Sequence, residues 1–404
     1  MNRSSILQIA GFILLTQSIG VMAELVPSVG VVTMYDDNIY TMDNGGVDSW
    51  ITKVIPSVKL NIDDGATSYM VEAGAETGVY TASSQDDYTD YHLHATDEVD
   101  FDLRNRLKID LSHVYGHDDR GSGRTDTTTK SFDNNSAFVL AQDIGEPDVK
   151  VTDGAGLEYE YGAEGARGRA VVGINFGDLD YQNHTQITNQ MDYSSRAIQA
   201  TGYLLVSPRT SLLIEANTQQ INYDQLVSTA GPTFGSSRDS LEHKYFVGAE
   251  WKATAKTEGS IKFGYQERIP YDSLYENFHS TAWEGDVVWR PKSYSVFRFN
   301  ATRRLSESAS GSTYVDDQIT GANWRHGWSA LVGTELFVQY EKVAYPNLTG
   351  AKDDIRTFGF LADYRITDSV ILDASYKYSE RNKAAIGMDY YRNVYQIGAQ
   401  AKFQ

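Results

Sequence analysis

Side chains alternate between apolar and polar types over most of the chain, and this alternation restricts the fold more than any other feature. In 256–269, Ile261, Phe263 and Tyr265 are separated by polar residues and glycine. The same pattern recurs through the C-terminal half, in 243–251, 328–340, 370–378 and 391–403. A period of two residues places neighbouring side chains on opposite faces of a strand. The sequence therefore predicts an all-β protein.

The alternating segments are too long and too aromatic for an ordinary soluble sheet. They run about 11–16 residues, whereas soluble strands mostly have about 5–6 and a tilted strand crosses a bilayer with about 9–11. Their apolar faces often begin or end with Tyr or Trp, as at Tyr245 and Trp251, and the chain has 27 Tyr. Aromatic residues gather in this way at the two interfaces of a membrane barrel. After residue 23 no apolar run is long enough for a transmembrane helix, which leaves a closed β-barrel as the spanning structure.

Short turns and longer polar connections alternate strictly along the chain, so the predicted number of strands is even. We predict a transmembrane antiparallel up-and-down barrel of 18 strands, with 16 as the alternative. Both termini then lie on the short-turn side, which is periplasmic in outer-membrane barrels. The expected strand cores are 26–40, 48–62, 67–80, 91–102, 105–116, 150–161, 167–181, 193–206, 210–223, 240–253, 257–269, 280–290, 294–305, 314–325, 328–342, 354–366, 369–380 and 390–403.

The first 23 residues are typical of a secretory signal peptide. Arg3 supplies a positive start, Ile6 to Leu15 an apolar segment, and Val21 and Ala23 compact residues before a cleavage site. Cleavage near Ala23 leaves a single outer-membrane barrel domain, 24–404. Within it, 117–149 is the longest and most polar connection. This segment is either an extracellular loop or a loop folded into the barrel, where it would plug a water-filled lumen.

Composition excludes several classes of function. The formal net charge of -19 argues against a nucleic-acid partner, because phosphate binding needs clustered Lys and Arg. The chain has no Cys, which excludes a disulfide framework, a thiolate metal site and a Cys nucleophile. It has neither a Gly-x-Ser-x-Gly elbow nor a Walker or dinucleotide glycine motif. We therefore expect no enzyme activity, no catalytic residues and no cofactor.

Three residue groups resemble reactive or metal sites, but ordinary explanations are better. His113 and His117 are about 13 Å apart on a strand, too far to share one ion. His92 and His94 share a face about 7 Å apart, but no third ligand is evident. The acidic run 35–38 lacks the rest of a calcium loop. We therefore predict no metal site.

Polar residues on the face opposite the apolar one are the candidate pore lining. An ionised side chain facing lipid costs several kcal/mol, so paired acids such as Glu284 and Asp286 indicate a wet lumen rather than a glycosidase site. Both charge signs are interspersed with amides, which suits a hydrated, weakly selective channel. The pore-lining candidates are Lys262, Gln266, Arg268, Glu284, Asp286, Arg290, Arg298, Arg304, Glu335, Gln339, Asp363, Arg365, Asp373, Lys377, Arg392 and Gln396.

Several short motifs follow one another along the chain, with Pro27-Ser28-Val29 and the run 35–40 at the start, Pro56-Ser57-Val58 next, and 264–268 and 283–291 further on. In this order they resemble the β-barrel porins of the second BBP type, including EpsL-like and Vibrio polysaccharide-locus barrels. The resemblance covers most of the mature chain. The resemblance implies an outer-membrane barrel for export of an exopolysaccharide or capsular polysaccharide. It also implies a periplasmic polysaccharide-export protein as partner, and it transfers no catalytic residue.

The expected partners are thus outer-membrane lipid and lipopolysaccharide, the secreted polysaccharide and the periplasmic export protein, with no nucleic acid. A general diffusion porin for small solutes is the main alternative. An outer-membrane enzyme or adhesin is a third class, and the enzyme version lacks any nucleophile or metal constellation in the sequence.

Overall fold

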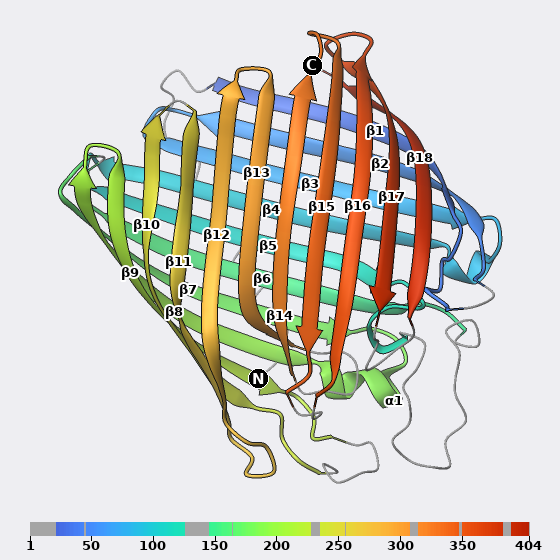
Figure 1. Ribbon diagram of the computed structural model, residues 1–404, viewed down its shortest axis with the longest axis horizontal. Helices are drawn as coiled ribbons and strands as arrows, with labels where there is room; N and C mark the ends of the chain where they lie inside the picture. The colour runs from blue at the N-terminus through green and yellow to red at the C-terminus, as the bar shows by residue number, and fades with distance from the viewer. Residues whose placement is uncertain are drawn as a thin grey trace.

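The computed structural model describes residues 22–43, 46–125, 145–163, 165–227, 235–254, 256–307, 314–346, 350–382 and 389–403. These residues form one sheet of 18 strands (Figure 1). The strands are β1 (Met22–Asp36), β2 (Ser49–Asp63), β3 (Thr67–Tyr80), β4 (Tyr88–Asp102), β5 (Asn105–Asp118), β6 (Asp148–Tyr161), β7 (Gly168–Tyr181), β8 (Tyr193–Ser207), β9 (Thr210–Tyr223), β10 (Ser240–Thr254), β11 (Thr257–Pro270), β12 (Phe278–Lys292), β13 (Ser295–Glu307), β14 (Tyr314–Gly327), β15 (Val332–Ala344), β16 (Lys352–Arg365), β17 (Val370–Asn382) and β18 (Tyr390–Lys402).

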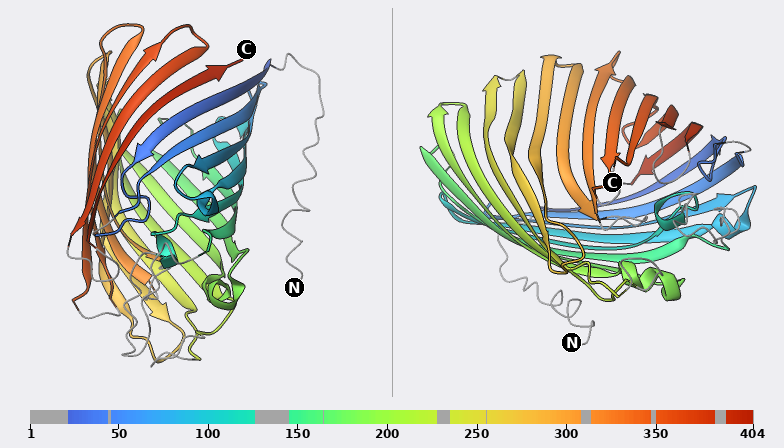
Figure 2. Two further views of the ribbon diagram at one scale, coloured as in Figure 1. Left: turned by 90° about the vertical axis from the view of Figure 1, so that its right-hand side faces the viewer. Right: turned by 60° about the horizontal axis from the view of Figure 1, so that its bottom comes forward.

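Every strand pairs antiparallel with the next one in the chain, and the last strand pairs with the first. This closing pair runs from Ser28 opposite Lys402 to Asp36 opposite Val394. The strands therefore form a ring without a free edge (Figure 2). The predicted all-β antiparallel barrel and its strand number are confirmed. Closure satisfies the backbone hydrogen bonds of every strand, as a membrane interior requires.

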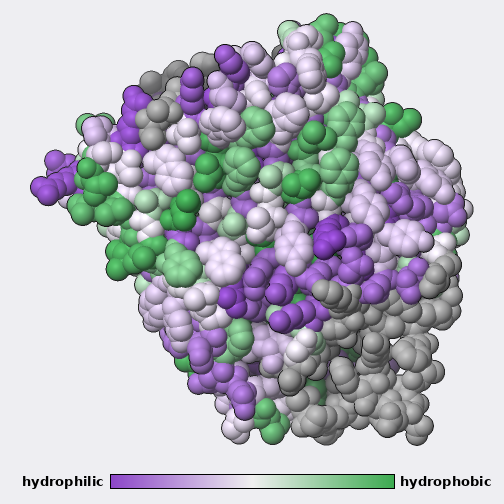
Figure 3. All heavy atoms as spheres, in the orientation of Figure 1, coloured by the Kyte–Doolittle hydropathy of each residue, from purple (hydrophilic) through white to green (hydrophobic). Residues whose placement is uncertain are grey.

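The strand pairings show which residues lie on the outer face of the barrel and which lie on the inner face. Tyr245 lies opposite Tyr265, and Val247 lies opposite Phe263. Such opposite residues point to the same side of the sheet. Large apolar side chains on this outer face are well exposed, with Val247 62% accessible. Figure 3 shows apolar and pale aromatic residues gathered over the upper part of the wall formed by β10–β17, with hydrophilic residues below them.

Aromatic rings lie towards both ends of the outer face. At the end with the short turns, the Phe297 ring packs between Trp289 and Trp324, with centroids 5.0 and 5.7 Å away. At the other end, Tyr91 stacks on Tyr115 at 4.7 Å. Rings at two levels with aliphatic side chains between them are the arrangement that a bilayer selects.

The connections alternate in length, as predicted. We call the two ends of the barrel the short-turn end and the long-loop end. The helix α1 (Thr185–Thr188) lies in one of the long loops. No helix among the described residues is long and apolar enough to cross a membrane.

Two element boundaries differ from the sequence prediction. The turn expected at His326-Gly327 is wrong, because β14 continues to Gly327 and the turn follows at 328–331. Ser329 fixes this turn: its hydroxyl oxygen accepts hydrogen bonds from the N–H groups of Leu331 and Val332, at 3.1 and 3.0 Å. β1 begins earlier than expected, at Met22, while residues 1–21 of the predicted leader lie outside the described residues.

Candidate functional site

The register places all the pore-lining candidates on the inner face. Lys262 lies opposite Glu284, Asp286 opposite Asn300 and Asp363 opposite Asp373. The candidates come from β11 to β18, with the exception of β14. Their role in lining a conduction path remains a prediction.

Several charged groups on the inner face neutralise one another. The Lys262 ammonium lies 2.5 Å from Glu284 and 3.1 Å from Glu215. Arg169 of β7 lies 2.6 Å from Glu250 of β10 and 3.1 Å from Glu160. At these positions the wall therefore offers hydrogen-bonding groups with little unbalanced charge.

Smaller contacts involve several further candidates. Arg290 pairs with Glu258 at 2.8 Å, and Gln266 donates to Ser280 at 2.9 Å. Gln396 donates to Asp373 at 3.4 Å. Other candidates, Asp286, Arg298 and Arg365, are exposed and have no ion pair within the described part of the chain.

The most deeply buried candidate is Arg268, which lies near the long-loop end and is 1% exposed. Its guanidinium pairs with Glu242 at 3.1 Å and with Glu307. The same guanidinium stacks over Tyr314 at 4.8 Å, and Tyr223 donates its hydroxyl proton to Glu307. This cluster joins β9, β10, β11, β13 and β14 from inside the barrel.

The loop that follows β1 folds inwards over the inner face. Ile39 and Tyr40 are buried against Ile51, with Met34 and Tyr80 packed beside them. Met34, Ile51 and Tyr80 are mutually opposite residues of β1, β2 and β3 on the inner face. The apolar side chains of 37–43 therefore cover part of the lumen wall at the long-loop end.

An ion pair between two other long loops holds this loop down. The Arg120 guanidinium donates to both carboxylate oxygens of Asp86, at 2.6 and 2.5 Å, and to the Tyr40 hydroxyl at 2.7 Å. Tyr40 donates in turn to Asp86 at 2.8 Å. Arg120 and Asp86 are 2% and 5% exposed. We call these three residues the mouth latch.

Ionisation of the latch follows from its burial. Burial raises the pKa of Tyr40, and the hydrogen bond to Asp86 raises it further. The hydrogen bond to Asp86 raises the pKa of Arg120 above its usual value. Tyr40 therefore stays neutral and Arg120 stays charged, which keeps these four hydrogen bonds in place across the physiological range.

The same loop is also fixed to the last strand. The Arg392 guanidinium donates to the buried carboxylate of Asp36, with its Nε 2.8 Å from the nearer oxygen. Asn38 donates its side-chain amide to the Tyr391 carbonyl at 3.0 Å. The start of this loop is thus held by β18 as well as by the mouth latch.

Several histidines have an acidic neighbour. His94 lies 2.9 Å from Asp110, His113 lies 2.6 Å from Asp153, and His117 bridges Asp90 and Asp119. Among the described residues, no group of three or more His, Cys, Asp or Glu side chains is arranged to hold a metal ion.

Sequence reasoning missed the mouth latch and Arg325, which pairs with Asp363 on the inner face. Arg120 and Asp86 lie in segments predicted only as long polar connections, and no motif marks them. Arg325 ended a segment whose alternation is diluted by Asp and Thr. The remaining part of the predicted loop 117–149, residues 126–144, lies outside the described residues.

The chain is similar to known proteins in structure and in sequence family. Among solved structures, it is similar to the FrpB iron transporter from Neisseria meningitidis (9% identity, TM-score 0.49, 93% of this chain and 82% of that chain), the siderophore receptor PirA from Acinetobacter baumannii (9%, 0.47, 94% and 80%) and OccAB2 from Acinetobacter baumannii (10%, 0.46, 94% and 98%). No curated protein matches the chain. The family model "Putative beta-barrel porin 2" matches residues 24–403. The chain therefore belongs to the beta-barrel porin 2 family and is an outer-membrane barrel of the porin type.

Proposed function

We propose that this barrel is the outer-membrane conduit for a secreted exopolysaccharide or capsular polysaccharide. The observation that carries the proposal is the inner wall, where cations such as Lys262 and Arg169 are each shared between two carboxylates. A wall of paired charges exerts little net field on ions, yet offers many donors and acceptors to hydroxyl groups. A sugar chain can move along such a wall because each contact is weak and is replaced by the next.

The orientation follows the rule for bacterial outer-membrane barrels, which have short periplasmic turns and longer outer loops. Both termini then lie in the periplasm, as expected after removal of a leader near Ala23. The turns at 64–66 and 208–209 would meet a periplasmic polysaccharide-export protein that lacks an outer-membrane segment of its own. That protein supplies the polymer, and the barrel performs no chemistry.

The mouth latch is the proposed gate. It holds residues 37–43 over the inner face at the outer end, with Arg120 reaching across from the loop that follows β5. Engagement of the polymer and partner would displace this segment, which is anchored by polar contacts and one small apolar cluster rather than by a strand pairing.

The test combines export and conductance. Loss of the gene should abolish secreted polysaccharide, and the wild-type chain should restore it; unchanged secretion in the deletion strain would remove the proposal. In planar bilayers, the refolded wild-type barrel should conduct little, and Arg120→Ala should open it. Arg290→Ala is the matched control, because Arg290 also forms an ion pair with a carboxylate but lies at the short-turn end.

A general diffusion porin is the second candidate, and the family match favours it. It predicts steady, high conductance of the wild-type barrel without any partner. In that case Arg120→Ala would change the conductance little, and secretion of polysaccharide would not depend on the gene.

A further inference from the structure

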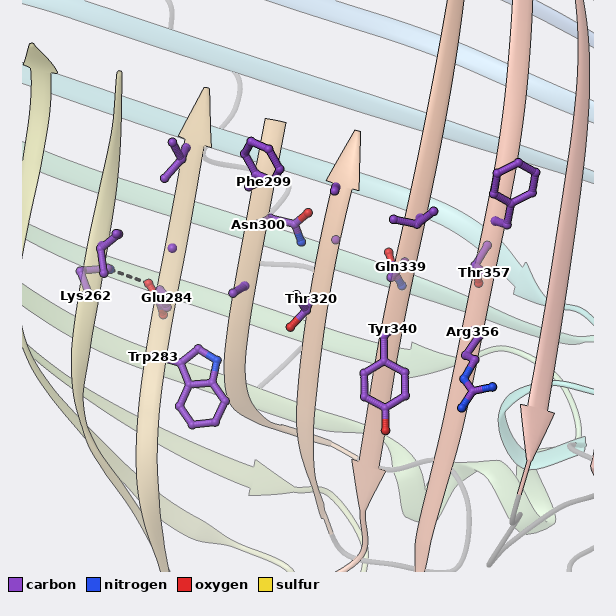
Figure 4. A pocket seen from close by; sticks show the side chains of 18 of the residues that line it. Lys262, Trp283, Glu284, Phe299, Asn300, Thr320, Gln339, Tyr340, Arg356 and Thr357 are labelled. Carbon is purple, nitrogen blue, oxygen red and sulfur yellow. Dashed lines mark ion pairs between the residues drawn. The ribbon is translucent and has the colours of Figure 1, made fainter. Parts of the chain in front are cut away.

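The outer face carries an apolar hollow of about 810 Å³ over β11–β17. Its base is a row of small outward residues, in which Gly285 lies opposite Ala301 and Ala301 opposite Thr320. Large side chains flank this row, among them Phe263 and Phe358. Figure 4 shows Trp283 and Tyr340 standing on either side of the small residues.

Cations gather along the side of the hollow that faces the long-loop end. The next row of outward residues in that direction contains Arg303 on β13 and Lys342 on β15. Each lies two residues further along its strand than Ala301 and Tyr340, respectively. Arg356 lies opposite Tyr340 on β16. Since the strand register fixes these rows, Arg303 and Lys342 lie beside the hollow, whereas Arg356 and its partner Glu380 line its edge.

Two of these cations are available to a ligand. Lys342 has no ion pair within the described part of the chain, although the Asp354 carboxylate, which accepts a hydrogen bond from Tyr340, lies opposite it on β16. The Arg356 side chain is 65% exposed beside its partner Glu380. The two residues are diagonal neighbours on adjacent strands, about 7–8 Å apart at their Cα atoms. Arg303 pairs with Asp316 on one side and stacks over Trp283 on the other. Its guanidinium therefore adds positive charge but is not free to bind a ligand.

We propose that this hollow binds one acyl chain of a phosphorylated glycolipid of the outer leaflet, lipopolysaccharide, whose phosphate is held by Lys342 and Arg356. The proposal rests on the orientation given above, in which the long-loop end faces outwards. The apolar base and aromatic sides would take the chain, since an unfilled hollow in the bilayer loses dispersion contacts on every lining atom. The two cations then meet the anionic headgroup at the level where phosphates lie.

A second copy of the barrel fits this surface less well. A twofold contact brings the same patch of both copies together, so that hollow faces hollow and the cations beside one hollow approach those of the other copy. Such a contact would leave a void and bring like charges together. A lipid chain has the complementary shape and the complementary headgroup charge.

The proposal can be tested by extracting the full chain from lipopolysaccharide-containing outer membranes into mild detergent and measuring retained lipid by native mass spectrometry. Wild-type barrel should retain lipopolysaccharide in a discrete ratio. Ala301→Phe should abolish retention by filling the base. Ala216→Phe is the control, because Ala216 is an outward alanine on β9, away from the hollow.

The contact between the two cations and the headgroup is tested separately. The double variant Lys342→Gln and Arg356→Gln should weaken retention at least about tenfold, because hydrogen bonds to charged groups are being replaced. Arg196→Gln, an outward arginine on β8, should not. Heat-dependent mobility on gels verifies that each variant is folded. Equal retention by all folded variants, or a dimer that Ala301→Phe dissociates without any loss of lipid, would overturn the proposal.

Discussion

At the scale of single residues, ion pairs on the inner face differ widely in burial. Arg268 and its partner Glu242 are 1% and 3% exposed, whereas Arg290 and Glu258 are 36% and 42% exposed. A buried carboxylate that loses its cation keeps the full cost of its desolvation, but an exposed one is rehydrated. The same type of contact therefore contributes to stability in one place and contributes little in the other.

Removal of Arg268 should be much more damaging than removal of Arg290. Arg268→Ala removes the cation that pairs with Glu307 and leaves Glu242 with the more distant Lys244, 3.6 Å away, and should lower the free energy of unfolding by about 3–5 kcal/mol. Arg290→Ala should lower it by less than about 1 kcal/mol. Urea titration of the barrel in lipid vesicles, followed by gel mobility, measures both. Equal losses in the two variants would contradict the importance of burial.

At the scale of elements, the strands were predictable and the loops were not. Alternation located β10, β11 and β17 because a membrane strand must expose apolar residues on one face and polar residues on the other. The β14–β15 turn was misplaced because Trp328 continues the apolar period, while the Ser329 hydroxyl actually sets the turn. The inward fold of 37–43 depends on contacts with Asp86 and Arg120, far along the chain, which leave no local pattern.

Close backbone approach makes one strand glycine irreplaceable. A Cβ atom on Gly264 of β11 would lie 1.8 Å from the Tyr245 carbonyl oxygen of β10. Gly264→Ala must therefore shift the two strands, and should strongly reduce the yield of folded barrel. Gly30→Ala is the control, because its Cβ would have no neighbour nearer than 3.6 Å. Refolding yield by gel mobility distinguishes them, and equal yields would show that the sheet adjusts freely.

Acid should loosen the loops at the mouth. Burial acts to raise the pKa of Asp119, but its hydrogen bond to His117 and the charge of that ring outweigh burial and leave the pKa below the usual 3.8. A depressed carboxylate pKa stabilises the folded loops above pH 3.8, and this stabilisation disappears as the pH falls through the folded-state pKa.

Protease accessibility of the loop that follows β5 should therefore rise between neutral pH and pH values below 3.8 in the wild-type barrel. Asp119→Asn should show a smaller change, because the titrating group is gone and part of the loop contact is already lost. An identical acid response in both proteins would assign the transition to other carboxylates.

At the scale of the whole molecule, the two levels of aromatic rings define where the bilayer lies. Val247 is 62% exposed midway along β10, between Trp251 and Tyr245. Arginine on the lipid face costs about 2–4 kcal/mol at the bilayer midplane and about 0–1 kcal/mol near an interface.

Val247→Arg should therefore destabilise the barrel in vesicles by about 2–4 kcal/mol, while His243→Arg, on the same face nearer the long-loop end, should cost about 0–1 kcal/mol. Unfolding titrations in vesicles provide the values. In detergent micelles, which adapt around a charge, the difference should shrink. A larger cost for the His243 variant would place the hydrocarbon region nearer the long loops.

The pairing of β1 with β18 affects the order in which the strand pairings of this barrel form. Every other pairing joins neighbours in the chain, so hairpins can form one after another with little loss of chain entropy. The Ser28–Lys402 pairing joins almost the two extremes of the sequence and can form only after all the others. Until then, an open sheet exposes two unpaired edges, each able to capture another chain. The rate of ring closure, rather than the strength of the finished wall, therefore sets how long the polypeptide needs protection from aggregation.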